Sequence, residues 1–179
     1  MRSSKIAAGV AALVTTLALP AQFAGAATMT GGHVRVWATP SPAGNGGTVM
    51  ITGAVADYGR TINTNKAGVP TSSGYYAKLI LHKGTFRVNA VAFNLKVNKS
   101  QPSFDAASCS AWLSVSGPVT LFGGTGDYAN ISGTVDITEA VAFVFPRYAA
   151  GKDKGQCNTN AQPLSTWASL TGTGTVDFS

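Results

Sequence analysis

The sequence is poor in charge and in histidine. Only 11% of its 179 residues are charged, and His33 and His82 are its two histidines. The 13 basic residues outnumber the 7 acidic ones but are scattered, without the basic patch and interleaved aromatics that nucleic-acid binding needs. No metal-ligand spacing, Gly-x-Ser-x-Gly elbow, phosphate-binding loop or dinucleotide fingerprint is present. We therefore expect no nucleic-acid partner, no metal site and no cofactor.

Helical periodicity is also missing after the first 27 residues, where no window carries an apolar stripe at i, i+3, i+4 and i+7. Alternation with a period of two recurs instead, which is typical of strands with one apolar face. The alternating segments are 34–38, 48–56, 75–82, 84–97, 109–122, 131–145 and 167–178. Seven or eight such strands suit an all-β fold, either a barrel or a sandwich. We predict a single antiparallel β-barrel of about eight strands, because closure removes exposed strand edges.

Three details of the strand pattern carry specific expectations. Asp57-Tyr58-Gly59-Arg60 is predicted to end the second strand in a polar turn, followed by a long exposed loop over residues 61–74. Apolar residues change from even to odd positions within 84–97, which we interpret as a bulge or bend near residues 89–92. Gly117-Pro118 interrupts the segment 109–122 and indicates an edge, a bulge or a corner.

The first 27 residues have the parts of a secretory signal peptide. Arg2 and Lys5 precede an apolar run over residues 6–19, and Ala24-Gly25-Ala26 supplies a small-x-small cleavage pattern. The alternative is a membrane anchor, but the run is shorter than the roughly 20 residues that span a bilayer. We predict cleavage, which leaves a secreted, extracellular protein with one domain over residues 28–179. That part has a net charge of 11 − 7 = +4 and no transmembrane segment.

Both cysteines, Cys109 and Cys157, lie in the part expected to be exported, where oxidising conditions favour disulfides. The alternative is a cysteine nucleophile, but that needs a nearby base, and both histidines are distant in sequence. We predict a Cys109–Cys157 disulfide that stabilises the fold by about 3 to 5 kcal/mol.

A hairpin is predicted over residues 121–138. Gly123, Gly124 and Gly126 let the backbone reverse sharply, Asp127 hydrogen-bonds within its own turn, and Tyr128 packs against the hairpin. This GGTGDY motif and the ISGT that follows it resemble the GGTG-x-[YF]-x-x-x-x-G hairpin of the allene oxide cyclase and dirigent barrel families.

Further segments carry the same resemblance. The motifs ITGA at 51–54, DYG at 57–59, KGTF at 83–86 and GTGTV at 172–176 are similar to exported bacterial proteins of that barrel class. The resemblance implies an eight-stranded, calycin-like barrel with an apolar lumen, and it implies self-association into homo-oligomers. Plant relatives cyclise an unsaturated epoxide or steer radical coupling, but the residues around their lumen groups do not align with this chain. No catalytic residue is carried over.

Glu139 is the most suggestive single residue, because it continues the odd-numbered apolar face between Ile137 and Val141. If that register holds, Glu139 points into the lumen, where desolvation disfavours the charged form and suits the group to acid chemistry or to orienting a ligand. In the alternative, a bulge at Glu139-Ala140 turns the carboxylate to solvent, or an inward Lys or Arg pairs with it. We favour this alternative as the more ordinary arrangement.

Four further residues are candidates for ligand binding. His82 can exchange a proton near neutral pH, although its position at the end of a strand favours a rim residue. Asp57, Tyr58 and Arg60 cluster at a strand end, where binding sites often lie. The same three residues are also ordinary turn chemistry, which we favour.

Three classes of function remain. The leading one is a secreted barrel that binds a small apolar molecule or serves as an extracellular accessory module. The second is a cyclase or isomerase resembling allene oxide cyclase, with Glu139 contributing charge. The third is a structural cell-surface protein whose barrel is filled by its own side chains, which packing of the lumen by Phe86, Phe93, Phe143 and Phe145 would favour. Trp37, Trp112 and Trp167 are interpreted as core or rim packing rather than as a carbohydrate-stacking platform.

Overall fold

The structure is a computed structural model that describes residues 29–41 and 44–179, so the expected signal peptide lies outside the described residues. Within these ranges the chain forms nine strands and one short helix. Their bounds are β1 Gly32–Pro40, β2 Gly47–Gly53, β3 Asp57–Thr64, β4 Tyr76–Leu81, β5 Gly84–Asn89, α1 Val91–Lys99, β6 Ser103–Asp105, β7 Ser110–Gly126, β8 Ser132–Val144 and β9 Ser165–Asp177.

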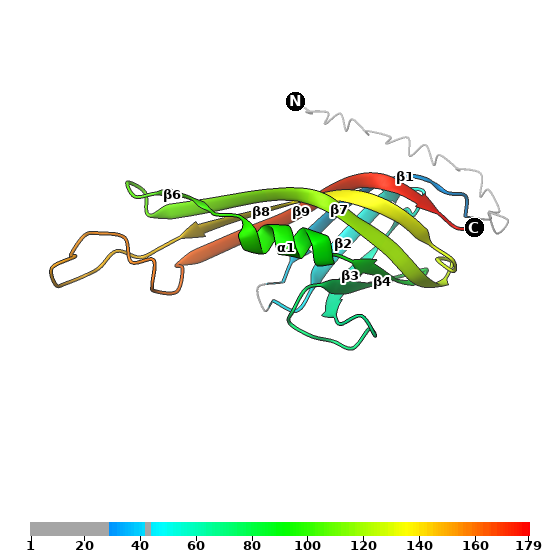
Figure 1. The fold of residues 1–179 in the computed structure, drawn as a ribbon, viewed down its shortest axis with the longest axis horizontal. Helices are drawn as coiled ribbons and strands as arrows, with labels where there is room; N and C mark the ends of the chain where they lie inside the picture. The colour runs from blue at the N-terminus through cyan, green and yellow to red at the C-terminus, as the bar shows by residue number, and fades with distance from the viewer. Residues whose placement is uncertain (1–28, 42–43) are drawn as a thin grey trace, which may run out of the picture.

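The strands form one antiparallel sheet that closes on itself. Neighbours follow the order β5-β4-β3-β2-β1-β9-β8-β7-β6, and β5 also pairs with β7. That extra pairing seals a barrel of eight strands and leaves β6 outside it, paired with β7 alone (Figure 1). The predicted all-β antiparallel barrel is therefore confirmed.

The two ends of the barrel differ. At one end, here called the closed end, the short connections 54–56, 82–83 and 127–131 come together. The other end, here called the open end, carries residues 41 and 44–46 between β1 and β2, the connection 65–75, and α1. The core lies between them and is made of inward-facing residues from the eight strands and of residues from α1 and the connections, with Phe86 of β5 and Tyr128 of the β7–β8 connection among the most deeply buried.

Strands β7, β8 and β9 are longer than the others and continue past the open end as a projecting sheet (Figure 1). We call this sheet the arm, and it consists of residues 103–105, 110–114, 140–144 and 165–169. Cys109 and Cys157 form the predicted disulfide at the far end of the arm, where the bridge joins the residue that precedes β7 to the connection between β8 and β9.

The prediction of a polar turn at Asp57 is wrong, because the chain has already reversed before that residue. Gly53 and Ala56 adopt positive φ angles of 81° and 43°, and Asp57 begins β3. The loop predicted to start at residue 61 starts after Thr64 instead. Alternation did not reveal β3 because the inward-facing residues in its second half, Thr61 and Asn63, are polar. This half of the strand therefore has no apolar face.

The phase change within 84–97 marks a helix rather than a bulge. β5 ends at Asn89, whose side-chain oxygen accepts a hydrogen bond from the backbone N–H of Val91 at 3.1 Å, and α1 follows. Only Phe93 of this helix is buried, so its apolar stripe is too short for periodicity to reveal. Across the described residues, α1 included, no helix has the length and hydropathy needed to cross a membrane.

Strand β7 passes through Gly117-Pro118 without a break. Pro118 lies opposite Asp136 of β8, between the part of β7 that pairs with β6 and the part that pairs with β5. At Pro118 the strand has a strand neighbour on one side only, so the missing proline N–H costs no ladder bond. The predicted strand edge is the arrangement found.

None of the three tryptophans lies in the core. Trp37, Trp112 and Trp167 are 40%, 59% and 60% exposed, because each occupies an outward-facing position of its strand. Trp37 lies on the barrel wall in β1, whereas the other two lie on the arm. Of the two alternatives given for these residues, core or rim packing, the core alternative is therefore wrong.

Candidate functional site

The barrel encloses a cavity of about 380 Å³. Its walls are inward-facing side chains of all eight barrel strands and of α1, and most of them are aliphatic or aromatic. Phe86 and Phe93 line it, whereas Phe143 and Phe145 stack on each other beyond the open end at 6.1 Å between ring centres. The lumen is therefore not filled by the four phenylalanines together.

Polar groups in the cavity wall gather toward the open end. They are the side chains of Ser41, Thr61, Asn63, Asn94 and Glu139. Asn94 is held in place because its amide donates hydrogen bonds to the carbonyl oxygens of Gly74 at 2.8 Å and Ala90 at 3.1 Å. An apolar pocket with a few fixed polar groups near its mouth is the usual form of a small-molecule site.

Glu139 is the one charged side chain among the described residues that line the cavity. It sits in β8 opposite Val115 of β7 and Leu170 of β9. The pairing of β7 with β8 runs without a shift from Ser110 to Leu121, so no bulge at Glu139 turns the side chain outward. The inward orientation, which was one of the two alternatives left by the sequence, is the one observed.

No charged partner among the described residues compensates Glu139. The single ion pair among the described residues joins His82 to Asp57, and Glu139 has no hydrogen bond within the same part of the chain. Desolvation by burial raises the pKa of the Glu139 carboxyl above its ordinary value. A carboxyl in this state is stabilised by any guest that brings a hydrogen-bond donor or a positive charge.

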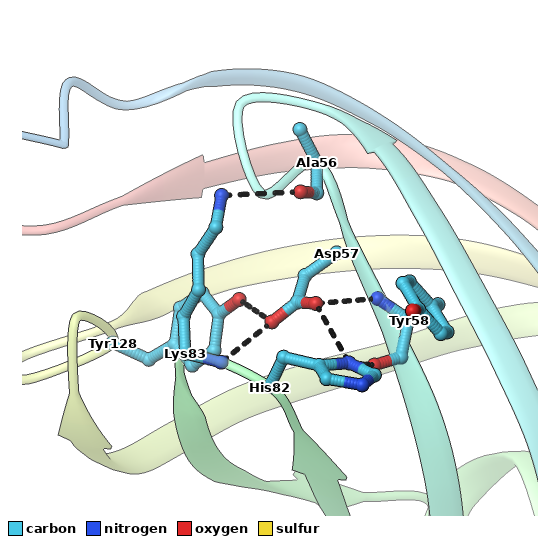
Figure 2. A network of polar contacts seen from close by, with 6 residues as sticks. All are labelled: Ala56, Asp57, Tyr58, His82, Lys83 and Tyr128. Atoms are coloured by element: carbon cyan, nitrogen blue, oxygen red, sulfur yellow. Dashed lines mark hydrogen bonds and ion pairs between the residues drawn. The ribbon is translucent and has the colours of Figure 1, made fainter. Parts of the chain in front are cut away.

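The closed end carries a second carboxylate with the opposite surroundings (Figure 2). The Asp57 side chain is 3% exposed. One of its oxygens accepts hydrogen bonds from the Tyr128 hydroxyl at 2.6 Å and from the Lys83 backbone N–H at 2.9 Å, and the other accepts from the Tyr58 N–H at 2.7 Å. The ammonium of Lys83 also donates to the carbonyl oxygen of Ala56 at 3.2 Å. These bonds join β3, the β4–β5 turn and the β7–β8 hairpin, and we call them the Asp57 latch.

Hydrogen bonding sets the protonation states in the Asp57 latch. Burial alone would raise the pKa of Asp57, but the bonds from Tyr128, Lys83, Tyr58 and His82 together lower it below its ordinary value. Burial, the hydrogen bond to Asp57 and the negative charges of Asp57 and Asp127 raise the pKa of Tyr128 well beyond its usual range. At neutral pH the pair is therefore a fixed carboxylate and a fixed phenol, which suits a structural role rather than proton transfer.

The β7–β8 hairpin explains how Tyr128 reaches Asp57. Gly123 and Gly126 adopt φ angles of 63° and 64°, and a side chain on Gly124 would collide with the carbonyl group of Tyr128. Tyr128 is 0% exposed and packs edge-on against Phe86 at 5.4 Å between ring centres. The glycine motif thus serves the Asp57 latch, and the partnership of Tyr128 with Asp57, 71 residues apart, has no signal in the sequence.

The remaining candidates do not join Glu139. His82 lies at the closed end with its side chain 59% exposed, and its ring stacks on Tyr58 at 4.1 Å between ring centres. With the proton on Nδ1, His82 donates to the Tyr58 carbonyl oxygen at 2.8 Å. Arg60 is exposed on the outer face of β3, opposite Ile80. The structure thus brings Asp57, Tyr58 and His82 together and leaves Arg60 and Glu139 apart from them.

In the part of the chain described here, no three His, Cys, Asp or Glu side chains are grouped so that they could hold a metal ion.

Comparison of the chain with protein-family models, with curated proteins and with solved structures gave no match in any of the three. The geometry of the lumen and of the outer surface therefore carries the functional argument by itself.

Proposed function

We propose that the protein acts outside the cell by binding a small, largely apolar molecule in its barrel lumen, with Glu139 holding the polar end of that molecule. The observation that carries this proposal is the cavity of about 380 Å³ with a single uncompensated carboxyl in its wall. That volume falls within the range of roughly 300 to 1,000 Å³ that is usual for small-molecule sites. It also argues against a purely structural barrel filled by its own side chains.

The apolar wall supplies the binding energy. A guest that loses 200 Å² of apolar surface to the lumen gains about 5 kcal/mol before the costs of immobilisation. Preformed strands keep those costs low, because the cavity needs no rearrangement to exist. The apolar part of the guest is thereby held without any charged contact.

Glu139 supplies the selectivity. Its oxygens accept no hydrogen bond from the described residues, so they favour a hydroxyl or amine head group and disfavour a carboxylate head group. The preferred ligand class is accordingly an apolar chain or ring system with a hydrogen-bond donor at one end.

The test uses the neutral fluorophore N-phenyl-1-naphthylamine with the full-length gene product expressed in an exporting host. We expect the probe to bind and to be displaced at pH 8 by decanol at least about tenfold better than by decanoate, a difference of about 1.4 kcal/mol. In Glu139→Gln, decanol and decanoate should displace the probe with similar affinities. Ala38→Phe, which fills the lumen beside Leu170, should abolish probe binding, and Ala129→Phe at the exposed closed-end turn is the matched control.

Equal binding of the probe by wild type and Ala38→Phe would show that the lumen is not the site. If Glu139→Gln still preferred decanol to decanoate, the lumen would remain the binding site, but Glu139 would not be the residue that selects the ligand. Native mass spectrometry of protein purified from its own host complements both results by weighing any retained guest.

A second candidate is a cyclase or isomerase acting on an unsaturated substrate folded inside the lumen. The raised pKa of the Glu139 carboxyl favours it, because such a group can donate a proton to a substrate or stabilise developing charge. Conversion of an unsaturated fatty-acid epoxide by wild type, and its loss in Glu139→Gln with binding retained, would support catalysis over simple binding.

A further inference from the structure

The arm carries two exposed tryptophans in one row. Trp112 of β7 lies opposite Ala142 of β8, and Ala142 lies opposite Trp167 of β9. Both indoles project from the same face of the sheet, the face that continues the outside of the barrel, and they are 59% and 60% exposed. Two strand spacings separate them, which is about 9.6 Å.

The surface around these indoles has small side chains, many of them hydroxyls, and almost no charge. The flanking positions on the same face are Ser110, Ser114, Ala140, Ala142, Val144, Ser165 and Ser169, of which Val144 is the one larger apolar side chain and is 43% exposed. The one charged position on this face within the described arm is Asp105, on the edge strand β6. Its carboxylate accepts bonds from the Ser108 hydroxyl and the Ala107 N–H, so it is already engaged.

The strands that carry Trp112 and Trp167 are held in place by pairing and by the disulfide, whereas the indole rings make no ring contact or hydrogen bond of their own within the described residues. Continuous antiparallel pairing fixes both strands against β8, and the Cys109–Cys157 disulfide with the Arg147 hydrogen bond to the Ala107 carbonyl oxygen at 2.7 Å fixes the far end of the arm. Neither Trp112 nor Trp167 makes a ring contact or a hydrogen bond of its indole within the described ranges. Each ring and each Nε1–H is available to a partner.

The size of this face argues against a protein partner. Three strands of five residues cover about 14 Å by 17 Å, or roughly 240 Å². Each side of a standard protein interface buries about 800 Å², so a second copy of the chain could not hold on this face alone. The lack of basic residues on the face likewise removes the attraction to anionic lipid that membrane docking uses.

A neutral, extended polysaccharide fits the same features. The C–H face of a pyranose ring packs on an indole, sugar hydroxyls exchange hydrogen bonds with serine hydroxyls, and no charge is needed on either side. The spacing of the two indoles is close to the two-sugar repeat of an extended β-1,4-linked glucan, so both rings engage one chain. We propose that this face of the arm docks the protein on the flat surface of an insoluble β-1,4-glucan. The proposal is independent of the lumen ligand.

The experiment is depletion of the full-length gene product from solution by microcrystalline cellulose. We expect retention of wild type and roughly tenfold weaker retention for Trp112→Ala and for Trp167→Ala, because each loses one stacking ring. The matched control is Trp37→Ala, which removes an exposed tryptophan from the barrel wall and should bind as wild type does. Ala38→Phe should also bind normally, which separates this site from the lumen. Intact mass with the disulfide present, together with circular dichroism, confirms that each variant is folded.

Equal retention of wild type and the Trp112→Ala/Trp167→Ala double variant would overturn the proposal. So would retention on chitin without retention on cellulose, or flotation with neutral phosphatidylcholine vesicles that depends on the two indoles. Sedimentation velocity supplies the last check, since a dimer that dissociates in the double variant would assign the face to self-association instead.

Discussion

The closed and open ends of the barrel each hold one carboxyl group turned away from bulk water, and the pKa values of the two groups shift in opposite directions. Asp57 is the more deeply buried, yet its pKa is lowered, because donors from three segments converge on it. Glu139 is less buried, yet its pKa is raised, because burial desolvates the carboxylate and no described residue donates a hydrogen bond to it. Burial raises the pKa of both groups, and the supply of hydrogen-bond donors decides whether that rise is overcome.

The same contrast separates folding from binding. The donors around Asp57 are all supplied by the protein, so that carboxylate has nothing left to offer a ligand and stabilises the fold. The acceptors of Glu139 are unused, so that carboxyl costs stability and is available to a guest. Buried polar groups without partners are typical of functional sites for this reason.

Removal of the Asp57 carboxylate should have the largest effect on the free energy of unfolding. Asp57→Ala leaves the Tyr128 hydroxyl and the Lys83 N–H without their acceptor, so we expect the free energy of unfolding to fall by about 4 kcal/mol. Urea unfolding followed by tryptophan fluorescence measures it. Asp136→Ala, on the exposed outer face of β8, is the control and should change stability by less than about 0.5 kcal/mol. A loss below 1 kcal/mol for Asp57→Ala would contradict the latch.

Removal of one donor from Asp57 should have an intermediate effect. Tyr128→Phe keeps the ring packed on Phe86 but deletes the hydroxyl bond to the carboxylate, so we expect a loss of about 2 kcal/mol. The Asp57 pKa should rise in this variant, because the first of the bonds that lower it is gone. Tyr148→Phe, in the connection between β8 and β9, is the matched control. Equal stability of the two variants would mean that the Tyr128 hydroxyl contributes nothing measurable.

The sequence predicted those parts of the molecule in which local pattern and global fold agree. The alternation of Leu170, Gly172, Gly174 and Val176 with threonines predicted β9, and two cysteines in a chain expected to be exported left one disulfide to form. The pattern failed in β3, whose inward residues Thr61 and Asn63 are polar because they lie near the mouth of the cavity. It failed again at α1, where a single buried phenylalanine is too little to establish helical periodicity.

The sites were harder to predict than the strands. Periodicity assigns the two faces of a strand but does not say where the strand leaves the barrel, so nothing in the sequence marks residues 110–114, 140–144 and 165–169 as an arm. Outward tryptophans therefore resembled packing residues. The sequence did not decide whether Glu139 points into or out of the barrel for a related reason. A bulge of one residue reverses the direction of the side chain, and the alternating pattern does not reveal such a bulge.

Neutralisation of Glu139 should change the free energy of unfolding least, and it should raise this free energy where the two preceding substitutions lower it. Because the folded-state pKa of Glu139 lies above the ordinary 4.5, the carboxyl costs nothing below that pH and destabilises the fold as pH rises through the folded-state pKa. Glu139→Gln should therefore match wild type at low pH and gain about 1 kcal/mol at neutral pH. The Asp57 contribution runs the other way, since its lowered pKa gives stability that is complete above the ordinary 3.8 and is lost on acidification.

Glu139 is the only glutamate in the chain, so its titration can be read without assignment. Protein labelled with [δ-¹³C]glutamate gives one carboxyl resonance, and we expect its midpoint above 4.5, moving further upward when the lumen fills with decane and downward when it fills with decylamine. Urea unfolding of Glu139→Gln and wild type across the same pH range links that midpoint to stability. A variant less stable than wild type at pH 7 would mean that Glu139 has a stabilising partner in solution. The contrast with Asp57, and with it the selectivity proposed for the lumen, would then be lost.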